Sequence, residues 1–448
     1  MATDMAQHFT YRRLIRATLP AIGMMLFKSL YVMTDGLFVS NVCGSTALAA
    51  TNFAFPLTMI LATIGFMLGT GGSAIVARTR GEGDEELARE RFTFFVCATI
   101  AISVVLAVAG LVAMRPIMGA LGAEGEMLEE ACVYGGILLV GLPVDACQLL
   151  FQNFYATAGK PGLGFANTVA AGVTNIVLDA VFVALLGMGV AGAAIATVSG
   201  EALAAIIPLV YFSRPNSSSL RFTKPRVDLA ILREACFNGS SEFVSNISSS
   251  LVSMAFNMQL LAWLGEAGVA AYSIILYFGF SFNAIFIGYS IGAAPLMGFN
   301  YGAENRAEMR SLFRKSLVVI GCTGIAMFVS TQLLADPLSG LFVRDEPEVL
   351  ALTVHAFTLY STAFLVMGFN IYGSSLFTSL SNGVISAIIS FFRTIVFEIG
   401  CVFLLPALIG PDGIWYAMLV AEIASFALSA GFAIRLEPRY GYWTGEAR

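Results

Sequence analysis

Twelve long apolar stretches run through the sequence, and they limit its fold more than any other feature. A helix needs about 20 apolar residues to cross the hydrocarbon core of a membrane, and each stretch is long enough. Of the 448 residues 58% are hydrophobic and only 12% are charged, whereas about 25% of a soluble domain is charged. We therefore expect an all-α integral membrane protein. Its twelve transmembrane helices are predicted near residues 14–39, 46–77, 92–114, 131–157, 163–187, 190–212, 235–262, 268–298, 316–335, 351–379, 384–408 and 412–434.

The cysteines and histidines are too few and too scattered to indicate a metal site. The seven cysteines contain no C-x-x-C pair and there are only two histidines, so neither a disulfide framework nor a zinc site is predicted. We expect no cofactor and no nucleic-acid partner. The first apolar stretch follows basic residues and has no small-residue cleavage site, so it is predicted to be a retained span rather than a signal peptide.

The basic residues predict the orientation in the membrane. With the N-terminus inside, the inner segments hold 20 of the 24 Lys and Arg residues, and the outer loops hold only Arg115 and Arg344. Because short cytoplasmic loops collect Lys and Arg, both termini are predicted to face the cytoplasm. We expect a multi-pass protein of the cell (inner) membrane, with the lipid bilayer as its surroundings.

The sequence repeats itself at a distance of 221 residues. This shift aligns the halves without a gap over roughly 158 positions, with identities such as Gly71/Gly292 and Gly81/Gly302. Each copy holds six spans, so both insert in the same direction, as in parallel-repeat transporters whose substrate lies between two lobes. The predicted parts are a first lobe (1–213), a cytoplasmic linker (214–233) and a second lobe (234–448).

The intramembrane acids break the repeat. An ionised side chain at the centre of a span costs roughly 2.5–3.5 kcal/mol or more, which makes such residues candidates for function. The counterparts of Asp35 and Asp179 are Phe256 and Gly400. Two carboxylates with amide and hydroxyl oxygens nearby suit a shared proton or a small hard cation. The polar residues predicted to meet in the outer half of the first lobe are Asp35, Asn175, Asp179 and Thr197.

Each acid also has a structural interpretation. Asp179 and its neighbour Asn175 would serve as a cross-link between helices, and Asp35 is close enough to an aqueous end to be a surface acid. Glu201 and Glu422 are repeat-equivalent, which favours a structural hydrogen bond at least as much as transport.

The second lobe has buried charges of its own. Arg393 and Glu398 lie five residues apart in one span. They would satisfy each other only with poor helical geometry, so partners on other helices are equally consistent with the sequence.

Several motifs together resemble one transporter family. In order and spacing they are similar to the multidrug and toxic compound extrusion (MATE) transporters over essentially the whole chain. The motifs are Tyr31-x3-Asp35-Gly-Leu-Phe-Val, Gly44, Ala47-Leu-Ala-Ala50, Pro56, Ala158-Gly-Lys-Pro161 and Gly192-Ala-Ala-Ile-Ala-Thr197.

The resemblance implies roles for individual residues. It makes Asp35, Asn175, Asp179 and Thr197 a cation- or proton-coupling site, because family members use an acid in helix 1, an Asn-x3-Asp pair in helix 5 and a Thr in helix 6. It further implies a helix-1 bend, cavity-lining positions and a looser helix-4 match. These fall on Pro20, Tyr31 and Asn153 respectively.

The sequence also departs from the family pattern. Lys28 lies two turns before Asp35 on nearly the same face, where a fixed cation opposes binding of a second one, and this favours H⁺ over Na⁺ as coupling ion. Glu201 stands where Gln is frequent, which adds an acid beside Thr197. The span at 351–379 has no carboxylate, so the second-lobe site of other branches is expected to be absent.

These features predict a monomeric antiporter that works by alternating access. It would export a small organic compound, cationic or amphipathic, while H⁺ or Na⁺ enters. The alternative is a flippase of the same superfamily for lipid-linked oligosaccharides or other amphiphiles. An intramembrane enzyme is not indicated, because the sequence has no H-E-x-x-H and no G-x-S-x-G motif.

Overall fold

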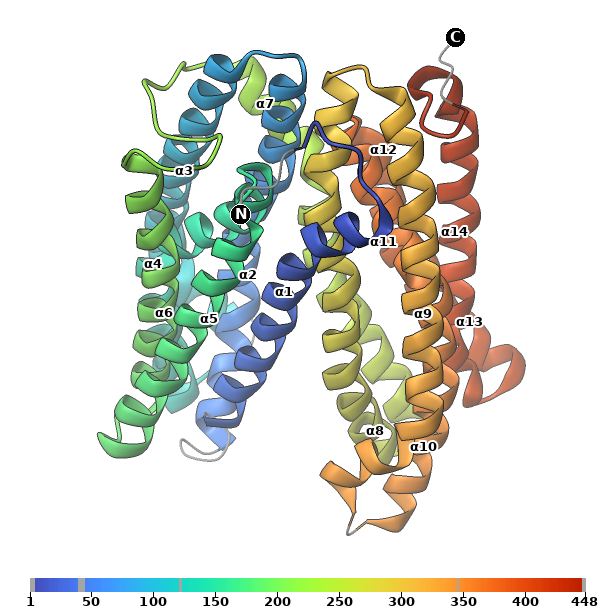
Figure 1. The fold of residues 1–448 in the computed structure, drawn as a ribbon. Coiled ribbons are helices and arrows are strands. Elements are labelled where there is room, and N and C mark those ends of the chain that lie inside the picture. The colour runs from blue at the N-terminus through green and yellow to red at the C-terminus, as the bar shows by residue number, and fades with distance from the viewer. Residues whose placement is uncertain (1–4, 39–44, 121–122, 345, 445–448) are drawn as a thin grey trace.

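In the computed structural model the protein is almost entirely helical (Figure 1). The structure describes residues 5–38, 45–120, 123–344 and 346–444. Side chains at 32, 33, 35–38, 45–49, 52, 53, 55, 126 and 341 lie outside the description. No strand occurs in the described ranges.

The helices follow one another with short connections. Three of the elements are short 3₁₀ or π-helical segments that continue a neighbouring α-helix. The elements are α1 (Tyr11–Phe38), α2 (Ser45–Gly81), α3 (Glu85–Ala120), α4 (Gly125–Thr157), α5 (Pro161–Asp179), η2 (Ala180–Leu185), α6 (Gly189–Ser213), α7 (Leu229–Asn238), α8 (Ser240–Gly302), α9 (Arg306–Val343), α10 (Pro347–Tyr360), η3 (Ser361–Ala363), α11 (Phe364–Ser379), α12 (Gly383–Phe391), η4 (Phe392–Glu398), α13 (Ile399–Ile409) and α14 (Asp412–Tyr440).

The described helices account for the predicted spans. Ten of them are long and apolar enough to cross a membrane. One of the ten, α8, is two helices joined at Gly265, whose φ of 65° and ψ of −156° are not helical. α1 has 28 residues, which also suffices for a crossing. With α8 counted twice and α1 added, the twelve-span prediction is confirmed.

Some boundaries differ from the prediction. The helix predicted near 92–114 runs as α3 from Glu85 to Ala120, because its polar ends continue the backbone hydrogen bonding beyond the apolar part. In the same way, α7 begins at Leu229, inside the predicted linker 214–233, where the Asp228 side chain caps the backbone N–H groups of Ala230 and Ile231.

The helices form two groups that lie side by side (Figure 1). We name α1–α6 with η2 the first lobe, and α8–α14 with η3 and η4 the second lobe; α7 packs mainly against α2 of the first lobe. The first lobe has two buried clusters, one of which also contains Ile231 and Ala235 of α7, and one large cluster occupies the second lobe. The last also contains Met5, Phe9 and Leu14 from the start of the chain.

Glycines allow the lobes to touch at the end predicted to face the cytoplasm, which we name the inner end. A Cβ on Gly81 would lie 2.0 Å from the carbonyl oxygen of Phe299, and a Cβ on Gly302 would lie 2.0 Å from that of Arg78. Both pairs of positions, 78/299 and 81/302, are 221 residues apart. The two contacts are therefore the same contact made twice, once from each repeat, and we call them the glycine seam.

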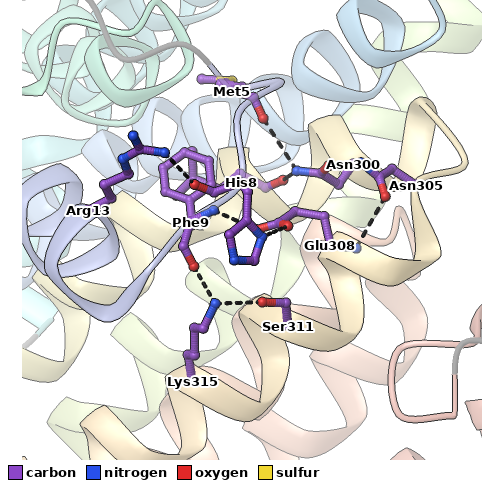
Figure 2. A network of polar contacts seen from close by, with 10 residues as sticks. Met5, His8, Phe9, Arg13, Asn300, Asn305, Glu308, Ser311 and Lys315 are labelled. Carbon is purple, nitrogen blue, oxygen red and sulfur yellow. Dashed lines mark hydrogen bonds and ion pairs between the residues drawn. The ribbon is translucent and has the colours of Figure 1, made fainter.

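A short segment from the start of the chain crosses to the second lobe. This N-terminal segment (5–10) packs on α8 and α9 (Figure 2). Glu308 accepts hydrogen bonds from the Phe9 backbone N–H at 2.8 Å and pairs with His8 at 2.6 Å. Lys315 donates to the Phe9 carbonyl oxygen. The segment thus ties the beginning of α1 to the inner half of α9.

Candidate functional site

Three of the predicted site residues meet between α5 and α6. Gly200 lets these helices approach, because a Cβ there would lie 2.9 Å from the Ala171 carbonyl oxygen. Asn175 is 3% exposed and its Nδ2 donates to Thr197 Oγ1 at 3.5 Å. Asp179 follows one turn later on the same face and is fully buried. We name Asn175, Asp179 and Thr197 the first-lobe polar group.

The backbone changes its helical form beside the acid. Asp179 is the last residue of α5, and the π-helical turn η2 begins directly after it. Short π-helical segments inside α-helices are rare and frequently occur at functional sites. The irregularity therefore coincides with the buried carboxyl.

α1 supplies the wall opposite α5. Asp35 belongs to α1, but its side chain lies outside the described residues. One turn earlier Tyr31 packs with Phe27 against Gly172 of α5, where a Cβ would lie 2.8 Å and 2.6 Å from the two rings. Tyr31 is thus held beside α5 at Gly172, which lies three residues before Asn175.

Lys28 faces a different part of the first lobe. Its ammonium lies 5.5 Å from the centre of the Phe66 ring, a cation–π distance. It also interacts electrostatically with Asp145 of α4 and Glu201 of α6. Because Lys28 is shared among these acids, it joins α1 to α4 and α6 rather than standing alone.

Asn153 and Pro20 lie apart from this group. Asn153 is buried against α2, with a Cβ on Gly69 placed 3.0 Å from its Nδ2, and it donates to the Leu149 carbonyl oxygen. α1 runs through Pro20 as a single helix. The predicted bend at this proline stays a prediction.

The second lobe contains a charged group that the sequence revealed only in part. Arg393 donates from Nε at 2.9 Å and from a terminal nitrogen at 2.6 Å to Glu422 Oε1. Asn370 Nδ2 donates to Glu422 Oε2 at 2.5 Å and to the Glu422 carbonyl oxygen at 2.8 Å. Arg393 thus finds its partner on another helix rather than in Glu398.

Sequence reasoning overlooked Asn370, although a signal was present. Its repeat counterpart is Leu149, so the comparison that selected Asp179 also selects Asn370. Together with Glu398 these residues form the second-lobe charged group: Asn370, Arg393, Glu398 and Glu422.

The MatE family model matches residues 20–181 and 243–404. The chain belongs to this family. The two matched segments start 223 residues apart, within two residues of the repeat found in the sequence. The match agrees with the resemblance to MATE transporters, so the protein is a multi-pass membrane transporter and not an enzyme.

Curated relatives match over most of their length. The multidrug export protein MepA of Staphylococcus aureus strain MRSA252 is 22% identical over 92% of this chain and 91% of its own. MepA of Staphylococcus haemolyticus is 23% identical over 92% and 90%.

Solved structures show the same MatE fold. An outward-facing multidrug resistance MATE transporter superimposes with a TM-score of 0.91 at 22% identity, covering 98% of this chain and 99% of that one. A transporter from Pyrococcus furiosus, described as having a binding pocket of reversed polarity, gives 0.88 at 23% over 98% and 99%.

Proposed function

We propose that this protein exports small organic compounds, cationic or amphipathic, from the cell by antiport with H⁺. The observation that supports the proposal is the buried Asp179 beside the Asn175–Thr197 contact, in a chain of the MatE family. A carboxyl in such surroundings binds a proton or cation when it can reach water on one side and releases it on the other. The MepA relatives are multidrug export proteins, which supports the direction of transport.

The proposed cycle couples proton uptake at the first lobe to release of the substrate. With the space between the lobes facing outward, Asp35 and Asp179 take up a proton. This changes the hydrogen bonding between α1, α5 and α6, and α1 bends near Pro20. The lobes then rock to the inward-facing state, in which the proton leaves and the next substrate enters.

The driving force is sufficient without ATP. One charge crossing 100 mV is worth about 2.3 kcal/mol, and about 1.4 kcal/mol corresponds to a tenfold ratio of concentrations. One proton per cycle therefore sustains roughly a 50-fold gradient of a neutral compound. One-for-one exchange with a monovalent cation moves no net charge, so the pH difference alone drives it, at about tenfold per pH unit.

The test is ethidium transport in proteoliposomes under an imposed pH gradient. We expect wild-type protein to move the dye and Asp179→Asn and Asp35→Asn to lose gradient-driven transport. Glu348→Gln, which neutralises an exposed acid of α10, is the matched control and should keep gradient-driven transport.

Transport unchanged by both Asp→Asn substitutions contradicts the site. Dye transport driven by a sodium gradient in place of the pH gradient contradicts H⁺ as the coupling ion. Failure to move any dye, with lipid-linked substrates moved instead, favours the flippase.

A further inference from the structure

The second-lobe charged group carries one negative charge more than it can pair. It holds one guanidinium, Arg393, and two carboxyls, Glu398 and Glu422. All lie inside the lobe: the side chain of Arg393 is 16% exposed and that of Glu422 is fully buried, and Glu398 is 5% exposed. An unpaired charge in such surroundings is expensive.

Glu422 uses the whole of the available positive charge. Its Oε1 accepts both hydrogen bonds from Arg393, and its Oε2 accepts the one from Asn370. Donors thus reach both oxygens, and the guanidinium is fully engaged by this carboxyl. The second-lobe charged group has no second positive charge to balance a negative charge on Glu398.

Glu398 itself has no hydrogen bond or ion pair with another side chain in the part of the chain that the structure describes. A second acceptor in the group, Asn370 Oδ1, is buried and likewise lacks a donor there. The group is therefore short of both a positive charge and a donor. A proton on Glu398 corrects the charge and turns one acceptor into a donor.

Several helices pack around Glu398, and none of their described residues adds a further cation. Besides Arg393, the charged or titratable groups that interact with it electrostatically are Glu422 of α14, Tyr360 of α10, Tyr272 of α8 and Cys401 of α13.

The backbone at Glu398 resembles that at Asp179. Glu398 is the last residue of the π-helical segment η4, and Asp179 directly precedes η2. η2 forms the last turn of the fifth span of the first repeat, and η4 lies inside the fifth span of the second repeat. Because π-helical turns are frequent at functional sites, their position beside a buried acid in each lobe favours a functional carboxyl at Glu398 too.

We propose that Glu398 is a proton-binding site of the second lobe, separate from the first-lobe polar group. It holds its proton while α8, α10, α13 and α14 are packed around it as in this structure, and exchanges it when movement of the lobe admits water. The bond that forms is O–H on the carboxyl, and the proton comes from and returns to bulk water.

The proposal is tested by infrared spectroscopy of the purified full-length protein in lipid nanodiscs at neutral pH. We expect Glu398→Gln to remove one protonated carboxylic acid band that wild type shows, and Glu398→Asp to keep a band at a shifted position. The exposed acid variant Glu348→Gln should leave the band unchanged. A Glu398→Gln spectrum that shows the same protonated carboxylic acid bands as wild type overturns the proposal. So does a Glu398-dependent band that added Na⁺ abolishes, because the site would then bind a metal cation.

This readout is independent of transport, so it separates the site from the proposed function. If Asp179→Asn abolishes ethidium export but Glu398→Gln leaves the infrared band intact, the proposed function stands and this site fails. If wild type itself does not export ethidium but Glu398→Gln removes the band, the site stands and the proposed function fails.

Discussion

The two lobes share a scaffold but place their polar residues at different positions of it. In the first lobe Asn175, Asp179 and Thr197 stand where the second lobe has Val396, Gly400 and Met418. In the second lobe Asn370, Arg393 and Glu398 stand where the first has Leu149, Gly172 and Val177. Of the intramembrane acids, Glu201 and Glu422 occupy equivalent positions in both repeats.

The two groups also differ in the length of the hydrogen bonds given for them. The Asn175–Thr197 hydrogen bond of the first lobe is 3.5 Å long, whereas Glu422 has an ion pair and an amide donor at 2.5–2.9 Å. The exchange of Arg393 for Gly172 also decides what packs there, because the missing side chain leaves room for Phe27 and Tyr31. The first lobe thus gains a movable α1 wall where the second has an ion pair.

The largest expected effect is the loss of the second-lobe ion pair. Glu422→Gln should lower the free energy of unfolding by about 3–5 kcal/mol, because it leaves the Arg393 guanidinium buried without its partner. Thermal unfolding in detergent measures this. The double variant Arg393→Met with Glu422→Leu should recover most of the loss. A small effect of Glu422→Gln on the free energy of unfolding would show that this ion pair does not hold the second lobe together.

Substituting either glycine of the glycine seam should weaken the contact between the lobes to the same extent. Gly81→Ala and Gly302→Ala each force a Cβ to 2.0 Å from a backbone carbonyl oxygen, and each should disturb the inner contact by up to about 3 kcal/mol. Distances between spin labels on α2 and α8 should lengthen in both variants.

The matched controls for the seam are Gly119→Ala and Gly340→Ala. These positions are also repeat-equivalent, but a Cβ there meets nothing within 4 Å. Unequal responses of Gly81 and Gly302 would contradict the symmetry of the seam.

A smaller effect is expected from substituting Gly172, which stands where the second repeat has Arg393. Gly172→Ala should cost about 1–2 kcal/mol, because its Cβ meets the mobile ends of Phe27 and Tyr31 rather than backbone. It should also reduce ethidium transport by displacing α1. Gly162→Ala on the same helix meets nothing and is the control. If both variants behave alike, the α1 wall does not depend on this glycine.

The smallest effect concerns the N-terminal segment. The His8 side chain is 62% exposed, and exposed pairs contribute about 0–1 kcal/mol. His8→Ala should therefore change the melting temperature little. Glu308→Ala should cost more, because Glu308 also accepts the buried Phe9 N–H. Equal losses of stability in His8→Ala and Glu308→Ala would show that the His8–Glu308 pair, rather than the Phe9 N–H bond, attaches the segment.

The spans and the repeat were predictable because apolar length and a constant shift are visible in one dimension. The contact of Asn175 with Thr197 was predicted with the help of family resemblance. The pairing of Arg393 with Glu422 was not, because it joins helices whose relative rotation no local pattern specifies. The seam glycines stood out as identities, but only the packing explains them. The attachment of segment 5–10 was not predictable, since nothing in its sequence reveals Glu308 as its partner.

The glycine seam bears on how such a chain could originate. Gly81 contacts the counterpart of Arg78, and Gly302 contacts Arg78 itself, so each half presents one patch to an equal patch on the other. That is the geometry of an isologous dimer interface. A half-length ancestor meeting its own copy across a twofold axis would make both contacts with a single glycine, and duplication into one chain then freed each half to change its polar residues independently.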